Sequence, residues 1–291
     1  MVKKGKKKHF SWFDLFNTLF MIVLAIIFLY PFWYTLIMSF ATPQYATSLG
    51  IKIFPPEITL AAYRSVLSDD NIWVAYANTL FRTIVGTILS VLVTYCAGYA
   101  LSRKNLPFRG AITFLIIFTM LFSGGLIPTF LTIKSYGLVN SRWALILPML
   151  TSAWNIIIAR NYISGLPEEL EEAALVDGAH PLKIAFQIMW PLSMPVISVL
   201  ALWSAVGHWN SWFDALIYCS GDDKIVLQLL LRRLLIQTQA EDSIMQSTIA
   251  ATTSDTIKCA TIIVAILPII CVYPFVQKYF VKGVTIGAVK G

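Results

Sequence analysis

The chain has 291 residues, of which 57% are hydrophobic and only 13% charged, and its mean hydropathy is +0.72. These polar side chains are too few to cover a water-soluble domain of this size, so the composition excludes an ordinary soluble protein and indicates a membrane protein. The net charge of +7 does not indicate a nucleic-acid-binding protein. Many of the lysines and arginines gather in the N-terminal tail and in short loops, as in proteins that follow the positive-inside rule.

Long apolar runs predict an all-α, polytopic membrane protein with six transmembrane helices. Each run reaches or approaches the roughly 20 residues that cross a bilayer as a helix. Strands of a β-barrel would instead be about ten residues long with alternating polarity. The first run follows a basic start, as in a signal peptide, but it is too long and lacks a cleavage site, so we expect a retained helix. The six runs are 16–40, 73–101, 111–133, 143–162, 191–218 and 257–281.

This topology predicts a multi-pass membrane protein with both termini in the cytoplasm. We expect four parts along the chain: a cytoplasmic basic tail (1–15), a first transmembrane helix with an outer loop (16–72), a transmembrane domain (73–275) and a cytoplasmic C-terminal tail (276–291).

Two loops, 42–72 and 219–256, are expected on the outer face. In the first loop we expect a short helix at Ala61–Leu67. The second contains "KIVLQLLLRRLLIQTQ", a basic amphipathic helix too short and too charged to span the bilayer. This helix either lies flat on the membrane or docks an outside partner.

The cytoplasmic segment 166–195, "LPEELEEAALVDGAHPLKIAFQIMWPLSMP", interrupts the apolar runs with acidic residues and prolines. Pro167 suits the first turn of a helix, where Glu168 and Glu169 meet the positive end of the helix dipole. We expect this helix to end near Val176, because Gly178 tolerates the left-handed conformation that closes helices. A second helix is expected from Pro181, with kinks at Pro191 and Pro195. The first helix would carry a small apolar surface bordered by carboxylates, which suits either plain solvation or insertion into a cleft of another protein.

The pattern in this segment resembles the EAA coupling loop of ABC-importer permeases, and 73–275 then resembles their type I transmembrane domain. Glu172, Ala173 and Ala174, then Asp177, Gly178 and Ala179, then Ile188 and Pro191, carry the resemblance; Trp190 departs from it, where the family usually has leucine. The resemblance implies that the loop docks in a groove of a separate cytoplasmic ATPase, whose closure would tilt the fourth and fifth spans. Glu172 and Asp177 would bond the ATPase or fix the elbow, and Ala173, Ala174 and Gly178 would permit close approach. The ATPase-coupling residues so implied are Glu168, Glu172, Ala173, Ala174, Asp177, Gly178, Ala179 and Pro191.

Nothing in the sequence indicates an enzyme. The phosphate-binding pattern G-x-x-x-x-G-K-[ST] is absent, as are H-E-x-x-H and G-x-S-x-G, and the histidines lie in separate segments. We therefore expect no catalytic residue, no metal and no cofactor on this chain, with ATP and Mg²⁺ bound by the partner ATPase.

Polar residues in the fifth span, "ALWSAVGHWNSWFDALIY", predict a substrate path. Trp203, Gly207, Asn210 and Asp214 are spaced 4, 3 and 4 apart, which puts them on one helical face, with Ser204, His208 and Ser211 beside them. Rings beside amide and carboxylate groups suit a sugar, although small and polar residues also join transmembrane helices. The full set is Trp154, Asn155, Trp203, Gly207, Trp209, Asn210 and Asp214. Arg82 lies inside the second span and needs either a counter-charge or water; Asp214 is the nearest candidate for the counter-charge by depth.

Three further stretches, "FPPEITLAAYRSVL", "NIWVAYANTLFRT" and "YPFVQKYFVKGVTIGAVKG", resemble the carbohydrate-uptake type of these permeases, namely the maltose-permease-like second permease and its LplC/YtcP-like branch. The resemblance implies a complex in the lipid bilayer of the bacterial cell (inner) membrane, made with a second permease, two ATPase subunits and an extracytoplasmic sugar-binding protein. The binding protein would be probed by the loop 219–256, and the ATPase would be reached by the tail from Val284 to Gly291. The alternatives are an ion-coupled secondary transporter, with Asp214 and Arg82 as coupling charges, and an ABC permease for peptides or amino acids.

Overall fold

The computed structural model describes residues 12–48, 50–244 and 255–271, and every regular element in these ranges is a helix. This confirms the all-α prediction. The chain falls into two compact units, one made of Met1–Ser68 and Leu234–Ala265, the other of Asp69–Arg233 and Ile266–Gly291.

The first unit begins with the long helix α1 (Trp12–Ser39), which is exposed along most of its length. The short helices α2 (Pro43–Thr47) and α3 (Ala61–Leu67) follow. The bounds of α3 are those predicted. A small cluster of buried side chains at the end of α1, including Met38, packs against Cys259 of a helix over 255–271.

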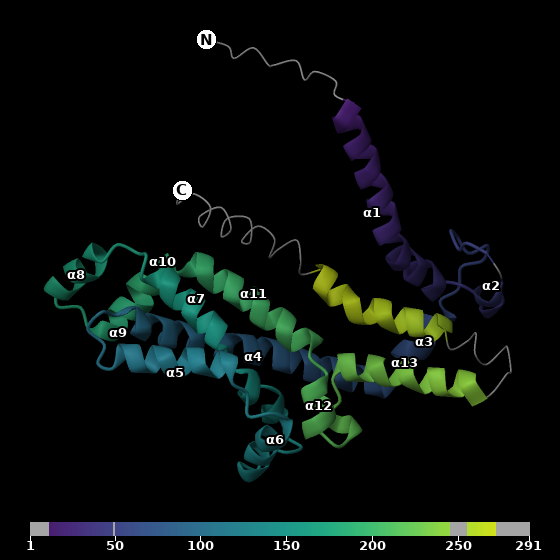
Figure 1. Ribbon diagram of the computed structural model, residues 1–291. Coiled ribbons are helices and arrows are strands. Elements are labelled where there is room, and N and C mark those ends of the chain that lie inside the picture. The colour runs from purple at the N-terminus through teal and green to yellow at the C-terminus, as the bar shows by residue number, and fades with distance from the viewer. Residues whose placement is uncertain (1–11, 49, 245–254, 272–291) are drawn as a thin grey trace. The chain divides into compact units, whose positions relative to one another are not determined.

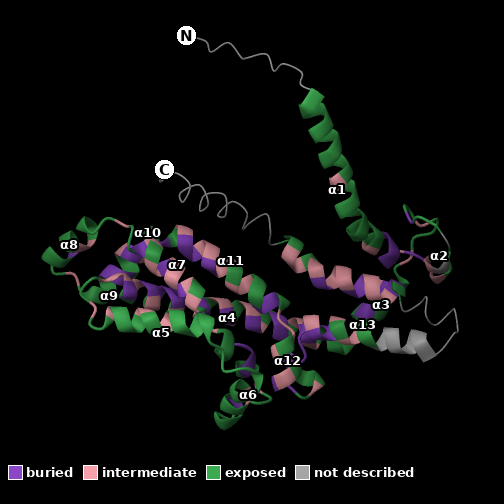
Figure 2. Cartoon of the chain, viewed as in Figure 1, coloured by how far each residue is buried: buried purple, intermediate pink, exposed green. Residues whose placement is uncertain are grey.

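The second unit is built around α4 (Asp70–Ser102), which packs most extensively against α7 (Ala153–Ile163) and α11 (Met194–Asn210) (Figure 1). A fourth helix, α5 (Arg109–Leu121), packs against α7 and has no buried residue of its own (Figure 2). An apolar helix with one face left bare is expected where lipid or another membrane helix covers it.

Short elements complete the two ends of this unit. At one end are α6 (Leu126–Ser135), η1 (Arg142–Leu145), η2 (Leu147–Met149), α12 (Phe213–Tyr218) and η4 (Asp222–Lys224), with the start of α13 (Leu227–Ile244). At the other end are α8 (Glu169–Val176), α9 (Pro181–Lys183), the π-helical turn η3 (Ile184–Met189) and α10 (Trp190–Leu192) (Figure 1).

Two predicted spans are bent within their length, and a third, 191–218, begins at a bend. The run 111–133 is divided into α5 and α6, which meet at 118°, and the run 143–162 into η1 with η2 and α7, at 50°. The third bend, of 81°, lies between Pro181–Leu192 and α11. In the first case Gly125 adopts a φ of +87°, a conformation that glycine takes without penalty, so the chain turns there instead of continuing the helix.

Two single helices, α1 and α4, are long and apolar enough to cross a membrane, and the three bent pairs raise this to as many as five spans within the described residues. The sixth predicted run, 257–281, is described only as far as 271, where it is helical. The basic tail up to residue 11 and the C-terminal tail 276–291 lie outside the described residues.

A core cluster of the second unit lies where α4, α7 and α11 meet the 166–195 segment. Tyr95 of α4, Ile163 of α7 and Leu200 of α11 are buried there together with Ala174, Ile184 and Met189 from the segment itself. The 166–195 segment is therefore anchored in the apolar core of this unit.

Candidate coupling loop and substrate path

The first helix predicted within 166–195 is α8, and its end is a well-formed Schellman motif. Gly178 has a φ of +76°, and its N–H donates to the carbonyl of Leu175 at 3.0 Å. The N–H of Ala179 donates to the carbonyl of Ala174, also at 3.0 Å. These two bonds satisfy carbonyls that a helix end leaves free and turn the chain sharply. The glycine elbow predicted from the sequence is confirmed.

The two alanines of the motif face opposite ways. Ala173 is exposed, together with Glu172 and with Val176, whose exposure is 87%. Ala174 is only 8% exposed and packs in the core of this chain. The expectation that both alanines permit approach of another protein therefore needs correction, because Ala174 lets α8 approach its own bundle.

After the elbow the chain starts again at Pro181, as predicted, but not as one regular helix. The imidazole Nδ1 of His180 accepts a hydrogen bond from the N–H of Leu182 at 3.3 Å and caps α9. The helix then widens into the π turn η3 just ahead of Pro191, which has no N–H to continue the α-helical bonding. Pro191 is exposed, and the predicted kink lies two residues later, at Ser193.

Trp190, which departs from the usual leucine, finds a specific place in the packing. Its ring meets Tyr95 of α4 edge-on, with 4.6 Å between ring centroids. The hydroxyl of Tyr95 donates to the carbonyl of Ala185 in η3. The aromatic pair therefore attaches the second half of the loop to α4.

Two ion pairs attach the first half of the loop to the end of α4, and sequence reasoning missed both. Arg103 pairs with Glu171, and Lys104 pairs with Glu168 at 2.6 Å. Glu168 is exposed, and the hydrogen bond and the charge of Lys104 lower the pKa of its carboxyl below the ordinary value. The first turn of α8 is rich in glutamates, so the sequence could not show which of them pair with basic residues of this chain.

The predicted substrate path is partly assembled on α11. Trp203, Gly207 and Asn210 are exposed and share one helical face, as their spacing predicts. Trp209 is only 5% exposed and belongs to the packing, and His208 is buried against Gly86. On α7, Trp154 is 58% exposed and Asn155 is half-buried.

Asp214 does not continue this face, contrary to our expectation. The helix ends at Asn210, and Ser211 is extended with a ψ of 134°, so Asp214 lies on the separate helix α12. The hydroxyl of Ser211 donates to the carboxylate of Asp214 at 2.8 Å. A serine such as Ser211, whose hydroxyl can form a hydrogen bond with a group close to it in the chain, favours such a break in a helix.

Asp214 instead forms an ion pair with Arg82, the pairing that was predicted from their depth in the membrane. Arg82 is completely buried on α4, and its guanidinium also donates to the carbonyls of Ser211 and Leu145, at 3.1 and 3.2 Å. Both carbonyls lie where a helix stops. Arg82 therefore satisfies backbone groups that the breaks would otherwise leave unpaired in a membrane.

Comparisons with known proteins agree with this geometry. Residues 3–286 match the model of the family described as the binding-protein-dependent transport system inner membrane component. The polygalacturonan/rhamnogalacturonan transport system permease protein YtcP of Bacillus subtilis (strain 168) is 40% identical over 96% of this chain and 98% of its own. Protein LplC of the same organism is 42% identical over 96% of this chain and 95% of its own.

A solved structure is also similar along nearly the whole chain. It is a crystal structure of a bacterial ABC transporter involved in the import of the acidic polysaccharide alginate, with 32% identity and a TM-score of 0.86 over 94% of this chain and 100% of that chain. The chain belongs to the binding-protein-dependent transport system inner membrane component family. It is an inner-membrane permease subunit of an ABC importer and not an enzyme, and the resemblance drawn from the EAA pattern is confirmed.

Proposed function

We propose that this chain is the second permease of a bacterial ABC importer that carries a carbohydrate, most simply an oligosaccharide, delivered by an extracytoplasmic binding protein. Membership of the family excludes the ion-coupled secondary transporter. The carbohydrate cargo is supported by the named cargoes of one relative and of the similar structure, polygalacturonan/rhamnogalacturonan and alginate. An importer of peptides or amino acids is the alternative that a transport assay would reveal.

The observation that carries the coupling role is the position and build of α8. It projects beyond the ends of α4 and α7 (Figure 1), and its outer surface is exposed, with Glu172 and Ala173 on it. Its inner surface is fixed in the core through Ala174. A rigid, exposed helix of this kind transmits a push at its tip to the helices beneath it.

We infer that α8 docks in a groove of one of two cytoplasmic ATPase subunits, and that the loop stands on the cytoplasmic side with both termini. Glu172 and Asp177 would bond the ATPase, Ala173 and Val176 would contact it, and Glu168, Ala179 and Pro191 would shape the loop around this contact. ATP and Mg²⁺ would be held by the ATPase. The second permease would complete a path that one six-span subunit is too small to enclose.

The elbow tests this assignment. Proline at position 178 cannot take a φ of +76° and has no N–H to donate to Leu175, so Gly178→Pro should displace the tip of α8. We expect the complete importer in proteoliposomes to keep ATP hydrolysis and to lose uptake driven by the binding protein. Gly178→Asn, which keeps the N–H and tolerates a left-handed conformation, should retain most of the uptake. Wild-type uptake by Gly178→Pro would refute the docking role of the loop.

The cargo is tested separately with the same proteoliposomes. We expect ATP-dependent uptake of labelled oligosaccharides that persists in the presence of a protonophore. Uptake of labelled peptides or amino acids in place of oligosaccharides would refute the carbohydrate assignment without touching the coupling role.

A further inference from the structure

We propose that the Arg103–Glu171 ion pair, held in place by Tyr99, is a positioning link through which the coupling helix α8 moves α4 together with α7 and α11. The inference rests on the proposed docking of α8 on an ATPase and adds a helix to the moving body. In the sequence analysis, the fourth and fifth spans were named as the moving helices.

The chain connects α8 directly to only two of the three central helices. It runs from α7 into α8, and from α8 through η3 and α10 into α11. The third, α4, is distant in sequence from the loop, although it is the helix against which α7 and α11 both pack. Apart from the Arg103–Glu171 pair, α4 is connected to the loop by the exposed Lys104–Glu168 pair and by the contacts of Tyr95 with the second half of the loop.

The Arg103–Glu171 pair connects α4 to α8 at the point where α4 stops. Arg103 is the residue that caps the end of α4, and Glu171 lies in the first turn of α8. A cation at a helix C-terminus and an anion at a helix N-terminus each interact favourably with the helix dipole. The pair therefore joins two helix ends whose own fields favour the charges they carry.

Tyr99, one turn earlier on α4, contacts both partners of the ion pair. Its hydroxyl donates to Oε1 of Glu171 at 2.9 Å, and the guanidinium of Arg103 lies 4.3 Å from the centre of its ring. An arginine stacked on a ring and a carboxylate with a second donor lose less freedom when they pair, because each is already restrained. The three side chains thus form one unit rather than a mobile surface contact.

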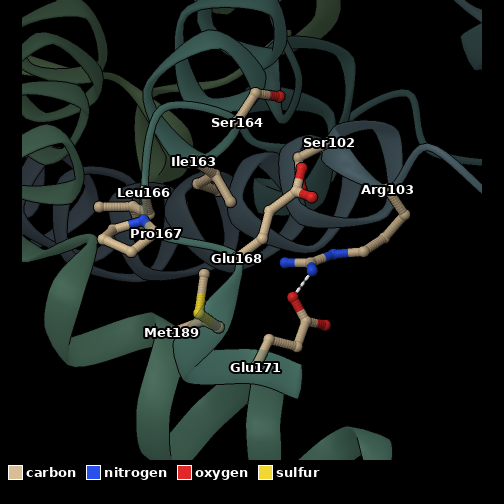
Figure 3. Close-up of a pocket in the computed structure, with 9 residues that line it drawn as sticks. All are labelled: Ser102, Arg103, Ile163, Ser164, Leu166, Pro167, Glu168, Glu171 and Met189. Atoms are coloured by element: carbon tan, nitrogen blue, oxygen red, sulfur yellow. Dashed lines mark ion pairs between the residues drawn. The ribbon is translucent and has the colours of Figure 1, made fainter. Parts of the chain in front are cut away.

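The ion pair lies beside a hollow between the end of α4 and the start of the loop (Figure 3). The end of α4 and the α7–α8 connection line a shallow hollow between them, with Ser102 on one side and Ser164 and Pro167 on the other (Figure 3). The Arg103 guanidinium is directed at the Glu171 carboxylate beside this hollow. The ion pair therefore joins α4 to α8 beside this hollow.

The neighbouring pair, Lys104 with Glu168, provides an internal comparison. Its side chains are 74% and 58% exposed, against 29% and 13% for Arg103 and Glu171. Water and salt screen exposed ion pairs strongly, so such pairs contribute little to holding two helices together. An arginine that is partly shielded from water and can form two parallel hydrogen bonds with a carboxylate holds its partner more firmly. Lys104→Gln is therefore a matched control, because it removes an adjacent cation and an ion pair between the same two segments.

The experiment measures molecules transported per ATP hydrolysed by the complete importer in proteoliposomes. In Glu171→Gln and in Arg103→Gln we expect this ratio to fall by roughly 2- to 30-fold, the range found for residues that couple distant sites, while the ATPase still co-purifies. Tyr99→Phe keeps the ring and removes the hydroxyl, so it should have a smaller effect. Lys104→Gln should leave the ratio unchanged.

A charge-swapped variant guards against simple misfolding. Arg103→Glu combined with Glu171→Arg restores an ion pair, although with each charge at the less favourable helix end, so we expect the ratio to recover in part. A swapped variant that assembles without any recovery would overturn the proposal.

Two other outcomes also overturn it. If Glu171→Gln behaves like Lys104→Gln, the pair does not transmit motion. If Glu171→Gln loses the ATPase on purification, Glu171 acts at the docking surface instead, and the docking proposal stands while the link to α4 falls. Failure of the docking proposal itself is seen separately, as wild-type uptake by Gly178→Pro.

Discussion

The buried guanidinium of Arg82 on α4 forms an ion pair with the carboxylate of Asp214 on α12, and the same guanidinium donates to the carbonyls of Ser211 and Leu145. One side chain thus connects α4 with the ends of two interrupted helices. In the membrane interior an unpaired charge or carbonyl is costly, so these four groups depend on one another.

We predict that Arg82→Met destabilises the protein more than Asp214→Asn does. Asparagine keeps an oxygen that can accept from Arg82, whereas Arg82→Met abandons both carbonyls and leaves Asp214 without its cation. Breaking a buried pair typically costs about 3–5 kcal/mol. The order of stability of the two variants is measured by thermal unfolding in detergent, with the fraction of protein that remains monodisperse as the readout.

Arg233→Gln is the control for this prediction, because Arg233 pairs with Asp222 at an exposed position, where such pairs contribute about 0–1 kcal/mol. A swap of Arg82 with Asp214 should rescue only in part, since aspartate at position 82 cannot donate to the carbonyls. Equal stability of Arg82→Met and the wild type would contradict the role given to this pair.

A second prediction concerns the close approach of α4 to α7. A Cβ on Gly98 would stand 2.7 Å from the Cβ of Ala159 and 3.0 Å from the backbone nitrogen of Arg160, so the backbones would have to separate. Gly98→Val should cost about 1–3 kcal/mol, as overpacked cores do. Melting of the purified permease checks this value.

Gly207→Ala serves as the comparison, because no atom lies within 4 Å of a Cβ at that position. There alanine should be neutral or stabilise α11 by up to about 1 kcal/mol, through its better helix propensity. If both variants melt like the wild type, the close packing of α4 on α7 is not required for stability.

A third prediction separates the substrate path from the packing beside it. Trp203 and Asn210 are exposed on one face of α11, while Trp209 is buried. We expect Trp203→Ala with Asn210→Leu to lower the rate of uptake and raise its KM, while the melting temperature stays near that of the wild type. Truncation of a buried aromatic residue costs about 3–5 kcal/mol, so Trp209→Ala should lower the melting temperature instead.

Transport kinetics over a range of binding-protein and cargo concentrations, with expression and ATPase assembly as checks, measure the third prediction. Unchanged kinetics in the double variant would show that the exposed face of α11 does not line the path. A Trp209→Ala variant that is stable but inactive would place Trp209 in the path after all.

Much of the local structure followed from the sequence by itself. The length of the apolar runs predicted helices across a membrane, and single residues with strong backbone preferences predicted where elements begin and end. Ala61–Leu67 and the elbow at Gly178 are the clearest cases. In each of these the deciding interactions lie within a few residues of one another, so the sequence contains all the partners.

The tertiary structure decided what depends on partners far apart in the chain. The 3.6-residue period placed Asp214 on the face of Asn210, but the helix ends at Asn210, and Arg82, more than a hundred residues earlier, donates a hydrogen bond to the carbonyl of Ser211 directly after that end. Periodicity cannot show such a break, because a distant donor stabilises it. In the same way, nothing in the acidic run distinguishes Glu171 from Glu172. Only the end of α4, with Arg103 and Tyr99, determines that one carboxylate faces inward while its neighbour remains free for another protein.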